Sequence, residues 1–508
     1  MDWLPSPFLK GLADEFFEDG LTAMIETNRG CPFHCTFCVW GAQDNYSKVT
    51  QFSVESVQAD LDYICEQVHK ALLLINDANF GLFNNRDLKI ARHIKKLKQE
   101  RNWPTSIVVN WGQVRSGAAI AVAEELKGIA VLRQASQSQD EQVLKTIKRD
   151  IVPETQWKYL AEECRREGIE SFAEMIVMLP NETLDTYLNG LRYFFDLGIN
   201  CIVTNQCQLL KGSEMNTQEH RDKYEMKTAW RLLESAYGKY DDFVCLEAEE
   251  IVVETNTFSF EENILCRKLN WLIQMSWTLR RHHLILKLLK ENQVNPVDFL
   301  LYVINHIDQA PREILELFKN FDKEAREELF PTYANLVEHY NMDDEIKNLQ
   351  GGGFKKLNTY YSGIALALNS QIILFYCEMA KQMLSEKDCY SEQCDETLKA
   401  VKLFTEKISV STMTLEEIKN GGAVMDKTLA FMYDIAEWET DFDQRPFTDF
   451  YVKKPLNYRF FIESDQNDSI KQFLKRVGHK DKNYQLQKLC EPFFGIPKEH
   501  LNYSYSNS

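Results

Sequence analysis

Three cysteines stand close together near the start of this sequence. They occur in the run Cys31-Pro-Phe-His-Cys35-Thr-Phe-Cys38, which has the spacing CxxxCxxC. Thiolates at this spacing on one short loop can hold three irons of a 4Fe–4S cluster, and the fourth iron is then left without a protein ligand. Because an open iron can bind a substrate or cofactor and pass it an electron, the spacing indicates redox chemistry.

Zinc is the other metal that these cysteines could hold. A structural zinc site takes four ligands, usually as two CxxC pairs. His34 could supply the fourth ligand, but its place in the middle of the loop makes a closed tetrahedral site awkward. The residues around the cysteines are Gly, Pro and polar, which differs from the surroundings of unrelated core thiols. The iron–sulfur interpretation is therefore favoured.

The cysteines follow the first of six apolar runs that are typical of buried strands. These runs lie at 21–27, 71–77, 106–111, 129–136, 171–179 and 201–210. Stretches with helical periodicity alternate with them, at 54–68, 86–100, 117–127, 139–149, 153–167 and 183–197. Such alternation predicts parallel βαβ units, with the functional groups at the C-terminal ends of the strands. We therefore predict an α/β fold, either an open sheet or a partial (β/α)6 barrel, with the cysteine loop at the end of its first strand.

The second half of the chain has a different character. After about residue 250 the strand signals fade, and we expect helices at 264–290, 310–320, 357–384 and 415–437. Glycines at 351–353 and 421–422 indicate breaks between helices. The aromatic-rich stretch 445–464 could add a strand or pack over the mouth of the barrel, and we expect residues 502–508 to be disordered.

We therefore expect three parts: a lead-in segment at 1–20, the α/β domain at 21–245, and a mainly helical domain at 246–508. The last would cover the mouth of the barrel and select the substrate. The chain has 508 residues, of which 44% are hydrophobic, which is ample for several domains.

The charge and the chain ends restrict the partners and the compartment. A formal net charge of −18 disfavours nucleic acid as the main partner. The N-terminus lacks the basic start and apolar core of a signal peptide, and no run of 18 apolar residues predicts a membrane span. The 13 cysteines, most of them single within apolar patterns, fit a reducing cytoplasm.

The sequence around the cysteines resembles the signature of radical S-adenosylmethionine (SAM) enzymes, including the aromatic Phe37 before the third cysteine. The lead-in Glu26-Thr-Asn-Arg-Gly-Cys-Pro32 resembles the cobalamin-dependent branch, as does Ser6-Pro-Phe-Leu-Lys-Gly-Leu12 upstream. The resemblance covers roughly residues 5–215 and implies a partial (β/α)6 radical SAM barrel. It also implies that Cys31, Cys35 and Cys38 bind a 4Fe–4S cluster whose unique iron chelates the amino and carboxylate groups of SAM.

The end of the second strand, Ile75-Asn-Asp-Ala-Asn-Phe-Gly81, takes the place of the family's Gly-Gly-Glu motif. That motif accepts hydrogen bonds from the SAM ammonium, so the resemblance implies this role for Asp77 and Asn79. The alternative is a turn capped by an Asx side chain.

The end of the fourth strand resembles a second family segment. The resemblance implies that Gln137 and Ser138 reach the ribose hydroxyls, and that Arg149 pairs with the SAM carboxylate through its fork of donors. The alternative is helix capping by Ser138 or Asp140, with Arg149 exposed.

The end of the fifth strand resembles the family's G-x-P-x-E-T pattern, in which the backbone hydrogen-bonds adenine. This implies that Met178 and Leu179 contact SAM, although Met178 replaces the usual glycine. Glu182 and Thr183 could equally be helix caps.

The resemblance implies an oxygen-sensitive enzyme. It would reductively cleave SAM to methionine and a 5′-deoxyadenosyl radical, and that radical would abstract hydrogen from a small-molecule substrate. A flavodoxin or ferredoxin would supply the electron. The sequence indicates no residue that relays or quenches the radical.

Cobalamin is the point at which this chain is expected to depart from the branch that it resembles. Only about 20 residues precede the barrel, and none of the ten histidines has the D-x-H-x-x-G context. We therefore expect no cobalamin site within this chain. The alternatives are a methyltransferase that takes cobalamin from a separate cobalamin-binding protein and a non-catalytic accessory subunit that keeps the fold. The three intact cysteines argue against the accessory subunit.

Overall fold

The computed structural model describes residues 1–41, 48–68, 72–111, 118–130, 132–167, 171–241, 243–409, 427–441, 444–461, 482–490 and 502–506. The chain divides into two compact units. The first comprises Met1–Gly190, Leu197–Lys227 and Thr255–Thr257, and the second comprises Leu191–Asp196, Thr228–Glu254 and Phe258–Ser508.

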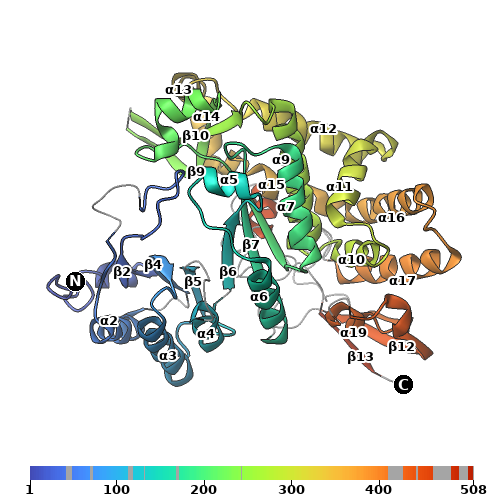
Figure 1. The fold of residues 1–508 in the computed structure, drawn as a ribbon, viewed down its shortest axis with the longest axis horizontal. Coiled ribbons are helices and arrows are strands. Elements are labelled where there is room, and N and C mark those ends of the chain that lie inside the picture. Colours follow the sequence, from blue (N-terminus) through green and yellow to red (C-terminus); the bar gives the residue numbers. More distant parts are fainter. Residues whose placement is uncertain are drawn as a thin grey trace. The chain divides into compact units, whose positions relative to one another are not determined.

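Parallel strands form the centre of the first unit (Figure 1). One sheet has the order β1 (Ala23–Ile25), β4 (Leu72–Phe80), β5 (Ser106–Trp111), and a second has the order β6 (Leu132–Gln137), β7 (Ser171–Val177), β8 (Cys201–Gln206). All their pairings are parallel. An isolated parallel bridge joins Ile107 of β5 to Ala130, just before β6. The α/β architecture with parallel strands is thus confirmed, and closure into a partial barrel stays a prediction.

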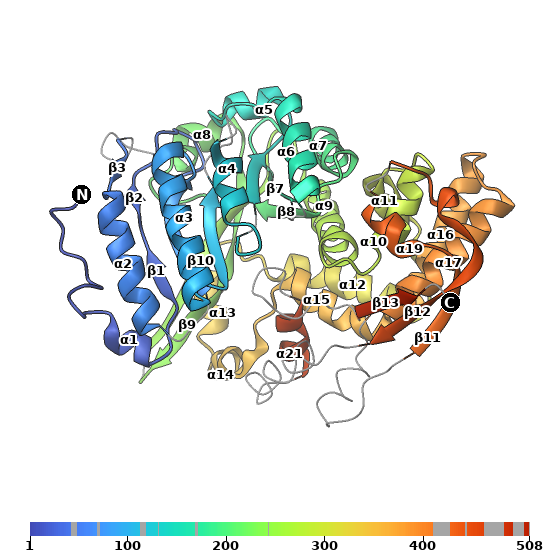
Figure 2. The same cartoon turned by 90° about the horizontal axis from the view of Figure 1, so that it is seen from below.

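The six helices expected in the first half are present. They are α2 (Val54–Gln67), α3 (Asn84–Arg101), α4 (Ala118–Glu125), α5 (Glu141–Thr146), α6 (Glu154–Glu167) and α7 (Leu184–Asp196). In both views α2, α3 and α4 lie side by side (Figures 1 and 2). Helix α2 begins at a Ser53 cap and buries Val57, Leu61 and Ile64, which recur at helical spacing on one face. Shorter elements complete the first unit: α1 (Asp14–Glu18), β2 (Asn28–Arg29), β3 (Thr50–Gln51) and α8 (Gln218–Lys223).

The second unit begins with a two-stranded sheet that the sequence analysis did not predict. It consists of β9 (Lys227–Tyr240) and β10 (Phe243–Glu254). Consequently, the boundary that we expected at 245 falls inside β10, and the sheet belongs to the second unit. These strands carry several Ala, Glu and Lys residues, whose strand propensity is low, and an apolar cluster around Leu232 and Leu246 stabilises their pairing.

Helices make up most of the rest of the second unit. They are α9 (Phe260–Ile273), α10 (His283–Glu291), α11 (Pro296–Asn305), α12 (Arg312–Glu327), α13 (Tyr333–Tyr340), α14 (Asp343–Asn348), α15 (Leu357–Ala365), α16 (Asn369–Glu386), α17 (Glu392–Ile408), α19 (Ile435–Thr440) and α21 (Lys482–Leu489). The helix expected over 264–290 is broken, because a π-helical turn at Gln274–Thr278 and a left-handed Arg280 (φ 56°) separate α9 from α10. Gly352 has a φ of 101°, in agreement with the break expected at 351–353.

Two expectations about the C-terminal region are wrong. Strand β11 (Lys427–Tyr433) lies where the end of a helix over 415–437 was expected, and β13 (Asn502–Ser506) lies in the stretch expected to be disordered. Both pair antiparallel with β12 (Tyr451–Phe461), the strand anticipated in the aromatic stretch. The physical reason for β11 is non-local, since Phe431 packs edge-to-face on Phe404 and Tyr458. The glycines at 421–422 lie outside the described residues.

One helical stretch of the described residues, Leu357–Glu386, is long and apolar enough to cross a membrane by length and composition alone. It covers α15 and α16, and 61% of its most apolar window is buried inside the structure. Core helices of globular proteins meet the same criterion, so this is weak support for a span.

Candidate active site

The loop that carries the three cysteines starts from a short antiparallel pairing of β2 with β3, in which Asn28 faces Gln51 and Arg29 faces Thr50. Backbone hydrogen bonds to two other segments of the chain hold the middle of the loop at Thr36. The Thr36 N–H donates to the Ile147 carbonyl at 3.0 Å, and the Met215 N–H donates to the Thr36 carbonyl at 2.8 Å. The loop therefore rests on the segments that follow α5 and β8.

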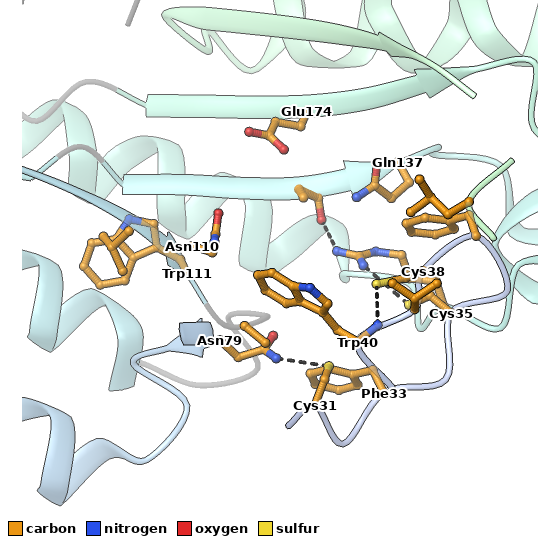
Figure 3. A pocket seen from close by; sticks show the side chains of 17 residues that line it. Cys31, Phe33, Cys35, Cys38, Trp40, Asn79, Asn110, Trp111, Gln137 and Glu174 are labelled. Atoms are coloured by element: carbon orange, nitrogen blue, oxygen red, sulfur yellow. Dashed lines mark hydrogen bonds between the residues drawn. The ribbon is translucent and has the colours of Figure 1, made fainter. Parts of the chain in front are cut away.

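All three cysteines line one pocket of about 460 Å³ (Figure 3). The strands contribute polar side chains to the same pocket, mostly from their last residues, as the α/β fold predicted. These residues are Asn79 of β4, Asn110 of β5, Gln137 of β6 and Glu174 of β7, and Arg149 joins them from beyond α5. Aromatic side chains complete the wall: Phe33, Phe37, Trp40 and Trp111.

Each cysteine sulfur has an N–H group directed at it. The Asn79 side-chain amide lies 3.1 Å from the Sγ of Cys31, the Arg149 guanidinium lies 3.8 Å from the Sγ of Cys35, and the Trp40 backbone N–H lies 3.5 Å from the Sγ of Cys38. Hydrogen bonds to cluster-bound sulfurs and the charge around them set the reduction potential of an iron–sulfur cluster. The surroundings of the three sulfurs therefore fit thiolates that carry negative charge.

Burial and charge act in opposite directions on these thiols. Burial raises the pKa of Cys35, while the neighbouring Arg149 opposes that rise. Burial also raises the pKa of Cys38, opposed by the Trp40 backbone N–H. Because a metal binds the thiolate, loading the site must release these protons.

The arrangement suits a cluster better than a single zinc ion. Within the described residues, no group of three or more His, Cys, Asp or Glu side chains is placed to hold one ion. Zinc needs all its ligands within about 2.0–2.3 Å of one point, whereas a 4Fe–4S cluster binds each cysteine through a different iron. His34, the alternative fourth zinc ligand, instead has its Nδ1 2.9 Å from the Gly41 carbonyl oxygen.

Asp77 is not among the residues that line the pocket, and its contact with the SAM ammonium stays a prediction. Its two oxygens accept from the N–H and hydroxyl of Thr27 at 2.6 and 2.5 Å, and from the N–H and side-chain amide of Asn28 at 3.2 and 2.6 Å. Burial raises its pKa to about 6, although the hydrogen bonds from Thr27 oppose this. Because Asp77 already accepts four hydrogen bonds, it fixes the position of Thr27 and Asn28, which lead into the cysteine loop.

Gln137 and Arg149 line the pocket and Ser138 does not, and the contacts predicted between these residues and SAM stay predictions. The Ser138 hydroxyl is fully buried and donates to Glu182 Oε1 at 3.0 Å, so it does not present its oxygen to the pocket. Gln137 adopts a left-handed conformation with φ of 73°, at an irregularity between β6 and β7. Arg149 also donates to the Ala135 carbonyl, which fixes its guanidinium beside Cys35.

Met178 and Leu179 are fully buried behind the end of β7, and neither side chain lines the pocket. Met178 has a φ of 73°, so it keeps the left-handed backbone that the family's glycine would favour. Thr183 caps α7 by accepting from the Thr186 N–H, as its alternative interpretation held. Whether the backbone at Met178 and Leu179 contacts SAM stays a prediction.

Glu174 and Asn110 were not predicted as site residues. Figure 3 shows both side chains on the opposite side of the pocket from Cys35 and Cys38. A charged residue in the middle of an otherwise apolar strand was the signal that could have identified Glu174. Asn110 gave no comparable signal, because its strand alternates in exposure.

No protein-family model matches the sequence. Over 265 residues the chain is 29% identical to "Cobalamin-dependent radical SAM methyltransferase TokK" of Streptomyces tokunonensis, covering 50% of this chain and 38% of the relative. Over 273 residues it is 29% identical to "2-(S-pantetheinyl)-carbapenam-3-carboxylate methyltransferase" of Streptantibioticus cattleyicolor, covering 52% of this chain and 39% of the relative. The matched region thus spans about two fifths of the length of these curated relatives.

Solved structures give a weaker likeness. One match is the cobalamin-dependent SAM radical enzyme OxsB, solved with aqua-cobalamin and SAM. The matched region spans 78% of this chain and 60% of the OxsB chain, at 16% identity and with a TM-score of 0.37. Another match is the radical SAM methyltransferase TsrM of Kitasatospora setae, solved with cobalamin and a [4Fe-4S] cluster bound. The matched region spans 40% of this chain and 37% of the TsrM chain, at 17% identity and with a TM-score of 0.34. Scores this low carry no argument about the present fold.

Over about half of its length, this chain is thus similar in sequence to a radical SAM enzyme. Both relatives are named as methyltransferases, and TokK is also named as cobalamin-dependent. The expectation that cobalamin has no place in this chain is not supported, because the TokK relative is named as cobalamin-dependent.

Proposed function

We propose that this protein holds a 4Fe–4S cluster through Cys31, Cys35 and Cys38 and uses it to cleave SAM for radical chemistry on a small molecule. The observation that carries the proposal is the convergence of the three cysteines on one pocket, with an N–H group directed at each sulfur. When bound, the cluster and SAM supply one electron and a 5′-deoxyadenosyl radical that abstracts hydrogen from the substrate.

The chain's own residues would bind and orient these groups. Arg149, fixed by the Ala135 carbonyl, offers its guanidinium beside Cys35, where the SAM carboxylate would approach the unique iron. Gln137 is placed at the pocket to reach the ribose, and Asn79 supports Cys31. The aromatic wall of Phe33, Phe37 and Trp40 would keep water from the reacting atoms.

Hydrogen abstraction without methyl transfer and cobalamin-dependent methyl transfer are the two candidate outcomes. The second is favoured by the relatives, since the two curated matches described above are both named as methyltransferases. Cobalamin would then be supplied by this protein or by a separate cobalamin-binding protein.

We also propose that the second unit selects the substrate and that a flavodoxin or ferredoxin delivers the electron. The enzyme would work in the cytoplasm, where its thirteen free cysteines would stay reduced.

Anaerobic reconstitution tests the cluster and the cleavage of SAM. The full chain is loaded with iron and sulfide, given SAM and dithionite, and assayed for 5′-deoxyadenosine. We expect about four irons per chain and product in the wild type, and loss of both in Cys35→Ala. The matched control is Cys389→Ala, which removes an exposed cysteine outside the pocket. Wild-type protein that forms no more product than Cys35→Ala contradicts the proposal.

Adding cobalamin separates the two outcomes. S-adenosylhomocysteine that appears only with cobalamin supports methyl transfer. If 5′-deoxyadenosine is the only SAM-derived nucleoside under both conditions, hydrogen abstraction without methyl transfer is supported.

A further inference from the structure

The cysteine loop leaves the sheet of β1 after Thr27, and the chain returns at Phe52. The two ends of the loop pair with each other, since β2 lies antiparallel to β3 and the Phe52 N–H donates to the Thr27 carbonyl at 3.1 Å. We call these paired ends, residues 27–29 and 50–52, the neck of the cysteine loop. A two-stranded pairing is only marginally stable by itself in water, so the neck needs further contacts to stay closed.

The Arg86 side chain, in the first turn of α3, supplies such contacts. Its Nη2 donates to the Thr27 carbonyl at 2.6 Å and to the Phe52 carbonyl at 3.1 Å, so one nitrogen holds both ends of the neck. Its Nε also donates to the Phe52 carbonyl at 3.3 Å, and its Nη1 donates to the Thr27 hydroxyl oxygen at 3.1 Å. Because the Arg86 side chain is only 11% exposed, these hydrogen bonds are largely shielded from water.

Arg86 also joins the neck to the turn that follows β4. Its Nη1 donates to the Asp87 carboxylate at 2.8 Å, and that buried carboxylate accepts from the Gly81 and Phe83 N–H groups at 2.9 and 3.0 Å. All N–H donors of the guanidinium are thus engaged. A planar fork can meet acceptors on three segments at once, and the compact ammonium of lysine cannot.

The segments that Arg86 joins are those that set the place of Cys31. Asn79 stands two positions before Gly81, and its amide donates to the Sγ of Cys31 at 3.1 Å (Figure 3). Cys31 follows Thr27 by four positions. A shift of the neck against the end of β4 therefore moves Cys31 relative to Asn79. Since one cluster would bind all three cysteines, such a shift also changes how the cluster is held.

We propose that Arg86 is a positioning residue that closes the neck of the cysteine loop and fixes Cys31 relative to Asn79. This inference rests on the proposed function, because it takes the cluster to be bound at the three cysteines. Arg86 is not among the residues that line the pocket. It acts through Thr27 and Phe52, and it keeps the thiolates in the arrangement that a productive cluster requires.

The competing assignment is that Arg86 only stabilises the fold. In that case its removal lowers the melting temperature and the fraction of chains that load a cluster, while each loaded cluster cleaves SAM at the wild-type rate. A positioning residue also changes the rate of SAM cleavage per loaded cluster. That rate therefore separates the two assignments.

Two measurements on the full chain test the proposal. Hydrogen–deuterium exchange with mass spectrometry follows the amides of the neck in cluster-free protein. Formation of 5′-deoxyadenosine per loaded cluster, with dithionite as reductant, follows SAM cleavage. In Arg86→Ala we expect exchange in the neck to be roughly tenfold faster or more, because several hydrogen bonds from a charged donor are lost. The rate per loaded cluster should fall by about tenfold, as misplacement of the reacting groups implies.

Two further variants sharpen the comparison. Arg86→Lys keeps a cation beside Asp87 but lacks the fork, so its rate per loaded cluster should lie between those of Arg86→Ala and the wild type. It carries the test if the alanine variant does not fold. The matched control is Arg92→Ala, which removes an exposed guanidinium from the same helix and should behave as the wild type does.

The positioning role is overturned if Arg86→Ala and Arg86→Lys cleave SAM at the wild-type rate per loaded cluster, or if exchange in the neck is the same as in the wild type. If the variants load no cluster, the exchange decides. Faster exchange confined to the neck supports the proposal, and faster exchange throughout the chain assigns Arg86 to the fold alone. If the wild type loads no cluster, the proposed function fails instead, and exchange in the cluster-free chain still shows whether Arg86 closes the neck.

Discussion

Asp77 of β4 holds Thr27 by both of its polar groups, accepting the backbone N–H at 2.6 Å and the hydroxyl at 2.5 Å. The two residues are 50 positions apart in the chain. The parallel pairing of β1 with β4 has the same offset, since Ala23 faces Leu73 and Ile25 faces Ile75. The sheet register therefore brings the carboxylate to the segment that leads into the cysteine loop.

Replacing Asp77 should loosen that segment. Asp77→Ala leaves buried donors of Thr27 and Asn28 without an acceptor, and we expect a loss of about 2–4 kcal/mol in unfolding free energy. Iron incorporation should fall in parallel, although no cluster ligand is changed. Thermal unfolding and iron analysis measure these effects. Asp62→Asn, which removes an exposed carboxylate of α2, is the control, and equal behaviour of the two variants contradicts the role of Asp77.

We expect Asn79 to raise the reduction potential of the cluster, in addition to its predicted contact with SAM. Its amide donates to the Sγ of Cys31 at 3.1 Å, and removing a donor favours the oxidised cluster because less of the added negative charge is stabilised. Asn79→Ala should lower the reduction potential by on the order of 40 mV, the equivalent of about 1 kcal/mol for one electron.

A redox titration followed by electron paramagnetic resonance measures that potential. Asn76→Ala is the matched control, because Asn76 is an exposed residue of the same strand that points to Met24 instead. A potential that moves equally in both variants argues against a specific donor at Cys31.

Arg149 should matter for its shape as well as its charge. One nitrogen is held by the Ala135 carbonyl and another faces Cys35, an arrangement that the single ammonium of lysine cannot reproduce. We expect Arg149→Met to weaken SAM binding roughly 10- to 100-fold and Arg149→Lys to recover only part of the loss. Equilibrium dialysis of cluster-loaded protein measures this. Lys158→Met, a change on the exposed face of α6, is the control, and a lysine variant that binds SAM as tightly as the wild type would contradict the prediction.

Glu182 should make stability depend on pH. It is fully buried, its Oε2 has no hydrogen-bond partner among the described residues, and burial raises its pKa well above the ordinary value. The folded state therefore binds a proton that the unfolded state has lost, and this contribution to stability disappears as pH rises through the folded-state pKa.

Glu182→Gln keeps an oxygen for the Ser138 hydroxyl and does not ionise. The melting temperature of the wild type should fall relative to this variant as pH rises above the ordinary pKa of glutamate and through the raised pKa of Glu182 in the folded state. Glu182→Ala, which leaves a cavity, should cost about 2–3 kcal/mol. If the glutamine variant is as unstable as the alanine variant at every pH, Glu182 is not held as a neutral acid.

Local patterns predicted the first unit well because several of its strands lie in apolar runs and its helices are amphipathic. Strand β5 coincides with the run at 106–111, and α2 coincides with 54–68 to within one residue. The second unit was less predictable. The strands β9 and β11 have weak local signals, and each depends on packing against residues distant in sequence, such as Leu246 for β9 and Tyr458 for β11.

The sequence by itself predicted the chemistry of the cysteine loop and determined its position after the first strand, because ligand type and spacing are local properties. Only the tertiary structure decided which polar side chains serve that loop. Asp77 and Asn79 differ by two positions, yet one holds Thr27 and the other faces Cys31. Their roles depend on the register of β1 against β4 and on the path of the loop beyond it. Both are contacts between residues about 50 positions apart, which no local pattern encodes.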